Sequence, residues 1–74
     1  MTAEVLKELL HEIPFRPFSI HLPDRPPMRV PHPDFAFVAP DGRAMLVYNE
    51  DGKRFSWVDV ALITQAEPEV KRRR

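Results

Sequence analysis

The apolar residues of this chain change their spacing once, at Pro14, and that change decides what the chain can fold into. Before Pro14 they recur with the period of an amphipathic helix, at Val5, Leu6, Leu9, Leu10 and Ile13. Beyond it they alternate with other residues, as they do in strands. Thr2 is a suitable N-cap, and Pro14 disfavours further helix. The pattern predicts one helix at about residues 3–12, packed on a sheet through Leu6, Leu9, Leu10 and Ile13.

Short strand patterns fill the rest of the chain. Alternating or apolar runs predict strands near residues 18–22, 28–30, 35–39, 44–48, 55–58 and 62–66. Proline-rich segments and Asp-Gly pairs separate these runs, and Asp51-Gly52 is the strongest hairpin signal among them. The connections leave no room for crossover helices. We therefore expect five or six short antiparallel strands, arranged as a small barrel or a strongly bent sheet that the helix covers.

The same patterns predict which side chains form the core. The seven aromatic residues fall mostly on alternating positions and are expected to face inward; they are Phe15, Phe18, Phe35, Phe37, Tyr48, Phe55 and Trp57. The segment 44–48 is apolar on both faces, which is typical of a central strand buried on both sides. Truncation of Leu9 or Phe37 to alanine is expected to cost about 2–5 kcal/mol.

Charge divides the chain into a body and a tail. The 74 residues hold 11 basic and 11 acidic side chains, but Lys71, Arg72, Arg73 and Arg74 supply four of the basic ones. Residues 1–70 therefore carry 7 basic against 11 acidic groups, a net charge of −4. We expect one β domain over residues 1–69 and a disordered basic tail over 70–74. No apolar run is long enough to cross a membrane and the first residues do not resemble a signal peptide, so a cytoplasmic location is expected.

Side chains that could support catalysis are sparse. The chain has no cysteine, and its two glycines lie in Asp-Gly pairs, so a glycine-rich phosphate loop is excluded. No two histidines have the spacing of a metal site. His21, His32 and Asp34 could meet across the first hairpin, either as a metal or acid-base site or as a pair of exposed polar positions and a turn cap. We expect no enzyme activity, no cofactor, no metal and no small-molecule substrate.

Two resemblances follow from longer patterns. The segment Pro14-Phe15-Arg16-Pro17-Phe18, with His32-Pro33-Asp34-Phe35 and a late apolar strand, resembles a family of short uncharacterised bacterial proteins over nearly residues 9–68. Where that family has Asp-Gly-Arg, this chain reads Asp24-Arg25-Pro26-Pro27. The order of one helix and short strands is also similar to that of SH3-like barrels and of Sm-like RNA-binding proteins, although the glycine pattern of the latter is missing. The first resemblance implies a bacterial domain without an assigned activity, and the second implies a small barrel.

The sequence favours two kinds of function. The first is a non-catalytic protein-interaction or assembly module, either a homo-oligomer or bound to another protein, because a negatively charged body with a small core favours stability gained by association. The second is a small barrel that binds RNA or single-stranded nucleic acid. Its candidate binding residues are Arg16, Arg29, Arg43 and Arg54 together with Lys71, Arg72, Arg73 and Arg74.

Overall fold

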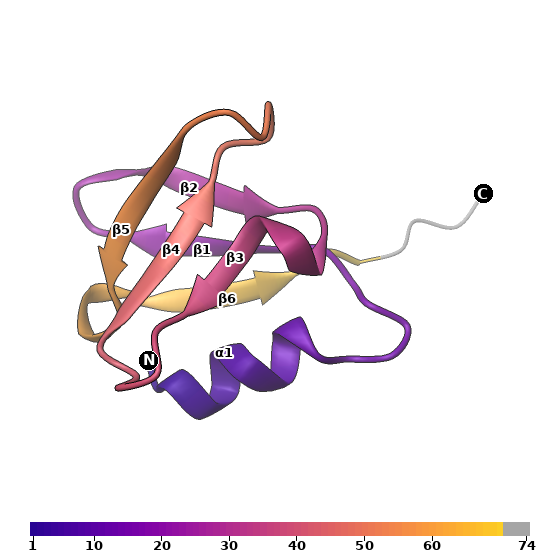
Figure 1. The fold of residues 1–74 in the computed structure, drawn as a ribbon, viewed down its shortest axis with the longest axis horizontal. Helices are drawn as coiled ribbons and strands as arrows, with labels where there is room; N and C mark the ends of the chain where they lie inside the picture. The colour runs from indigo at the N-terminus through magenta and orange to yellow at the C-terminus, as the bar shows by residue number, and fades with distance from the viewer. Residues whose placement is uncertain (71–74) are drawn as a thin grey trace.

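The computed structural model describes residues 1–70 and contains one helix and six strands in that range. The elements are α1 (Ala3–Leu10), β1 (Phe18–Leu22), β2 (Arg25–Val30), β3 (Ala36–Val38), β4 (Ala44–Tyr48), β5 (Phe55–Asp59) and β6 (Gln65–Pro68), with short 3₁₀ helices η1 (Pro33–Phe35) and η2 (Val60–Leu62). The strands form two antiparallel sheets in the orders β2–β1–β6 and β3–β4–β5 (Figure 1). A mainly β fold with an N-terminal helix is thus confirmed. Within residues 1–70 no strand pairing joins the two sheets into a closed barrel.

Helix α1 is shorter than predicted. The Thr2 side chain accepts a hydrogen bond from the Val5 N–H, which confirms the N-cap. The helix ends at Leu10 because Pro14 disfavours helical dihedrals at the residue before it and the chain turns away. Leu6 and Leu10 are buried, whereas Leu9 is only partly buried. The prediction for Ile13 is wrong, since its side chain lies in the loop and is 94% exposed.

The first sheet is built on β1. Phe18, Ile20 and Leu22 are buried in alternation, as predicted. The last strand differs from its prediction, because residues 60–62 form η2 and β6 runs from Gln65 to Pro68, where Pro68 pairs with Phe18. Pro68 is tolerated because β6 is an edge strand, so its missing N–H need not break a ladder hydrogen bond. The prolines at 26 and 27 lie within the other edge strand, β2, for the same reason.

The second sheet is a meander of β3, β4 and β5. Asp51-Gly52 makes the predicted hairpin turn, with Gly52 at a φ of 72° and the Asn49 N–H donating to the Arg54 carbonyl at 2.8 Å. β4 is the central strand, as predicted. Its Met45 and Val47 side chains are fully buried against the first sheet's core residues, while Leu46 lies on the opposite side and is only partly buried.

The core lies between the two sheets and against α1, and it holds only some of the aromatic residues predicted for it. Phe15 and Phe35 pack against it in part. Phe18 is fully buried. Phe37, Phe55 and Trp57 are exposed, so the prediction that these three face inward is wrong. Their strands present the other face to the core through Ala36 and Val38 of β3 and Val58 of β5. The side chains of a strand alternate between its two faces. If the other face of the strand is buried, every side chain predicted to be buried is therefore exposed instead.

Candidate interaction surface

The outer side of the β3–β4–β5 sheet carries a continuous group of apolar side chains. We call this group the aromatic face and define it by Phe37, Leu46, Tyr48, Phe55 and Trp57. The strand register places Phe37 beside Leu46 and Leu46 beside Trp57, so one row crosses all three strands. Tyr48 and Phe55 form the next pair, with ring centroids 5.6 Å apart. Phe37, Phe55 and Trp57 are 57%, 52% and 58% exposed.

Within residues 1–70, η1 borders this face beside Tyr48 through Phe35, and Phe37, Phe55 and Trp57 stay exposed. In Figure 1 the β3–β4–β5 sheet lies in front of the β2–β1–β6 sheet, and α1 runs along one side, below β3 and β6. The core residues of β4 and β5 point to the other side of the sheet. Exposed apolar side chains that are contiguous and not scattered singly are typical of binding surfaces.

Charged residues of both signs surround the aromatic face. At one end are Asp41 and Arg43, in the turn between β3 and β4, and Asp59, at the end of β5. At the other end the β4–β5 hairpin carries Asp51, Lys53 and Arg54. The Lys53 N–H donates to the Asp51 carboxylate at 2.9 Å and lowers the pKa of Asp51, so this carboxylate stays ionised in the folded chain. Each end therefore carries both signs, and these residues give a net charge of −1 at the Asp41 end and +1 at the hairpin end.

Two of the four candidate arginines, Arg29 and Arg54, line one pocket together with Glu50 and Asp51. Arg16 pairs with Glu12 at 3.9 Å, and Arg54 pairs with Asp51 at 3.6 Å. Arg29 bonds to two carboxylates, Glu50 and Glu69. Arg43 lies beside η2, where its carbonyl accepts from the Val60 N–H. Three of the four are thus interleaved with acidic groups, which neutralises the field that a phosphate backbone would meet. The basic segment 71–74 lies outside the described residues.

The contact between Arg29 and Glu69 joins β2 to the chain just beyond β6. The Arg29 guanidinium donates to both carboxylate oxygens of Glu69, one of them at 3.2 Å, and donates to Glu50 at 3.3 Å. The hydrogen bond from Arg29 lowers the pKa of Glu69, and the bond to Glu69 raises the pKa of Arg29. Sequence reasoning missed this site because its partners are 40 residues apart in the chain.

A pH-dependent stability difference is expected from this contact. Folding lowers the pKa of Glu69. The contribution of this contact to the stability of the folded chain is therefore complete above pH about 4.5, the ordinary glutamate value, and is lost as the pH falls through the folded-state pKa. The wild type should therefore melt at a higher temperature than Arg29→Met at pH about 7, and the two melting temperatures should converge as the pH falls below the folded-state pKa of Glu69. Glu69→Gln serves as the matched control and should show the same convergence. A difference that stays constant with pH would contradict the assignment.

The histidines and Asp34 do not form a joint site. His21 lies on β1 and its Nε2 is 3.1 Å from Glu67 on β6. His32 lies beyond the other end of the β1–β2 ladder, where its Nδ1 accepts from the Asp34 N–H at 3.2 Å. At about 3.4 Å per residue, the two histidines are separated along the strands by roughly 15 Å. Among the described residues no group of three potential metal ligands occurs. His32 acts as the N-cap of η1, which is the structural interpretation left open by the sequence.

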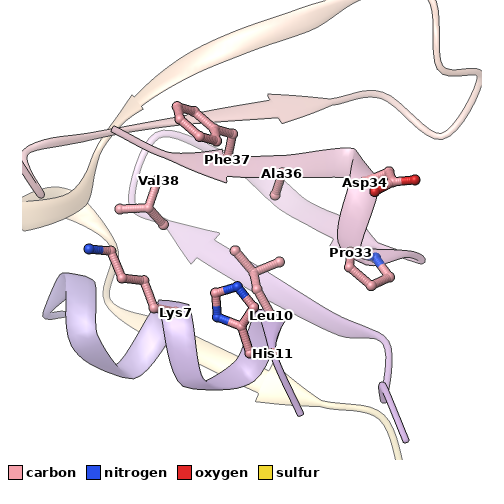
Figure 2. A pocket seen from close by; sticks show the side chains of 8 residues that line it. All are labelled: Lys7, Leu10, His11, Pro33, Asp34, Ala36, Phe37 and Val38. Atoms are coloured by element: carbon pink, nitrogen blue, oxygen red, sulfur yellow. The ribbon is translucent and has the colours of Figure 1, made fainter. Parts of the chain in front are cut away.

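A shallow groove of about 680 Å³ lies between α1 and β3 (Figure 2). Leu10 and Val38 point into it from the two sides, while Phe37 points to the opposite side of β3. The polar lining consists of Lys7 on α1, His11 at the C-cap of α1 and Asp34 in η1. These groups offer one imidazole, one amine and one carboxylate, without a serine or cysteine nucleophile in the lining. The groove borders the aromatic face at Phe37.

No protein-family model, no curated protein and no solved structure matches this chain. Within residues 1–70, no helix combines the length and the apolar character required to cross a bilayer. Interpretation of function therefore depends on the geometry of the aromatic face.

Proposed function

We propose that this chain is a non-catalytic protein-interaction or assembly module that binds its partner through the aromatic face. The observation that carries the proposal is the row Phe37, Leu46 and Trp57, which crosses an uncovered sheet and continues into Phe55. Taking roughly 150–250 Å² for each fully exposed aromatic side chain, Phe37, Phe55 and Trp57 together leave roughly 300–400 Å² in solvent. Aromatic residues of this kind dominate the binding energy of protein interfaces.

A second candidate is a nucleic-acid-binding module. Phe55 and Trp57 are exposed beside Arg54, an arrangement on which bases can stack. The net charge of −4 over residues 1–70 and the carboxylates paired with Arg16, Arg29 and Arg54 oppose phosphate binding. Protein binding is therefore the better supported of the two.

The connectivity supports a finer description of the fold. We propose that the two sheets are the halves of a small SH3-like or Sm-like barrel that is interrupted where Pro31-His32-Pro33 separates β2 from β3. In support, the last strand β6 pairs with the first strand β1, and a 3₁₀ turn, η2, precedes it. The two prolines remove ladder donors at the point where a single bent strand would otherwise pass from one sheet to the other.

A photocrosslinking experiment tests the function. The photoreactive residue p-benzoylphenylalanine replaces Trp57 on the aromatic face, and in a control it replaces Leu62, which is comparably exposed on η2. Illumination of cells that express each variant should give a protease-sensitive, nuclease-resistant adduct from position 57 and none from position 62. A nuclease-sensitive adduct would favour the nucleic-acid module instead, and equal yields from the two positions would reject the aromatic face as a binding surface.

A further inference from the structure

The β3–β4–β5 sheet is apolar on both sides, but the described chain covers only one of them. On β4, Met45 and Val47 face the core and are fully buried. Leu46 and Tyr48 lie on the other side of the same strand and are only partly buried, and among residues 1–70 no sheet or α-helix packs as a layer on that side. A sheet that is apolar on both faces normally has a layer packed on each of them.

We propose that a second copy of this chain supplies the missing layer, so that two β3–β4–β5 sheets pack face to face in a twofold-symmetric dimer. The inference rests on the proposed function and specifies its partner. Sheets that pack in this way lie about 10 Å apart and interdigitate the side chains of their facing sides.

The arrangement of the central row suits a twofold axis. Leu46 lies in the middle of the row, with Phe37 on one side and Trp57 on the other. A twofold axis that runs along β4, between the sheets, places Leu46 against its own copy. The same axis places Phe37 of each subunit against Trp57 of the other, so both aromatic contacts form together. An isologous interface requires self-complementarity of this kind.

The charges around the face also favour a second copy over a polyanion. The rim defined above holds three basic residues, Arg43, Lys53 and Arg54, and three acidic residues, Asp41, Asp51 and Asp59. The six charges sum to zero, and the axis along β4 places each end against its own copy, where acidic groups of one subunit can pair with basic groups of the other. A nucleic acid would instead require an excess of positive charge around the stacking residues.

The available area indicates a dimer of moderate affinity. A standard interface buries about 800 Å² on each partner, and the three exposed aromatic residues supply roughly 300–400 Å² of it. Leu46 and Tyr48 are only partly exposed, so most of the remaining contact area would come from the charged rim. An interface at or below the standard size fits a dissociation constant in the micromolar range, about 1–100 µM.

The dimer can be tested by sedimentation velocity and by the fluorescence of Trp57, the single tryptophan of the chain. Between about 1 µM and about 1 mM, the wild type should shift from monomer to dimer, and acrylamide should quench Trp57 less as the dimer forms. A wild type that stays monomeric over the whole range would overturn the proposal. If the crosslinking experiment also gave an adduct with a different protein, the interaction function would stand and only the dimer would be rejected.

Opposite charges at position 46 test the symmetry. Leu46→Arg alone, or Leu46→Glu alone, places two like charges against each other at the axis. Each of these variants should weaken dimerisation by about 100-fold or more. An equimolar mixture of the two variants should restore dimer, because position 46 faces itself. Leu62→Arg adds the same charge on η2, away from the face, and should leave the dimer intact. Circular dichroism verifies that each variant is folded, and a mixture of folded variants that stays monomeric would overturn the face-to-face arrangement.

Discussion

Replacement of Phe18 by alanine is expected to lower the free energy of unfolding by about 3–5 kcal/mol, and the same replacement at Phe37 by only about 1 kcal/mol. Both residues lie on strands and both substitutions remove the same atoms, so the difference isolates burial. Phe18 has no exposed surface and packs in the core, whereas more than half of Phe37 faces solvent. A loss of this size at Phe18 is a large part of the stability of a domain of 74 residues.

Urea denaturation provides the measurement for both variants. The chain should be kept at about 1 µM, so that association through Phe37 does not contribute to stability. The midpoint should fall much further for Phe18→Ala than for Phe37→Ala, without a change in the dependence on urea. Equal costs at the two positions would mean that β3 buries the face carrying Phe37, as the sequence pattern first suggested, and would reject the aromatic face.

The elements of the fold were largely predictable because each depends on local chemistry. The Thr2 cap, the alternation in β1 and the Asp51-Gly52 hairpin each leave a signal in a few adjacent residues. The central position of β4 was also evident from its apolar composition. The ends of α1 and β6 were less predictable, because Ile13 and Leu62 are apolar residues that the packed structure leaves exposed.

The orientation of β3 and β5 could not be read from the sequence. β3 places Phe37 on one face and Ala36 and Val38 on the other, and the side chains of both faces are apolar. Periodicity identifies a strand but does not say which of two apolar faces meets the core. The larger side chains were assigned inward on the basis of hydrophobicity. The structure instead uses the smaller ones, since β4 already presents Met45 and Val47 to the same core.

The candidate surface had one signal in the sequence, which was the apolar composition of both faces of 44–48. That pattern predicts two covering layers, and only one is found within residues 1–70. The charged groups had no such signal. Arg29 meets Glu69 and Glu50 only because β2, β6 and the β4–β5 hairpin converge in the folded chain. The carboxylates that pair with Arg29 could therefore not be identified from the sequence.

Truncation of Leu6 to alanine is expected to cost about 2–5 kcal/mol, whereas Leu9→Ala should cost about 1 kcal/mol. Both positions lie within α1, and alanine is the most favourable helix residue, so neither change weakens the helix itself. Leu6 is fully buried in the core, while Leu9 packs against it only in part. The cost of Leu9→Ala is therefore below the range that the sequence alone suggested.

The Leu6 variant also tests whether the helix and the sheets unfold together. Because Leu6 shares one core with residues of both sheets, a cavity at this position should destabilise the whole domain. Unfolding followed by helical circular dichroism and by Trp57 fluorescence should give coincident transitions, both shifted to lower urea. If α1 were only peripheral, the circular dichroism transition would shift while the fluorescence of Trp57 on β5 would not. Coincident shifts for Leu6→Ala, with little change for Leu9→Ala, would identify α1 as the element that completes the core. The aromatic face would then be the side of the second sheet on which α1 does not pack.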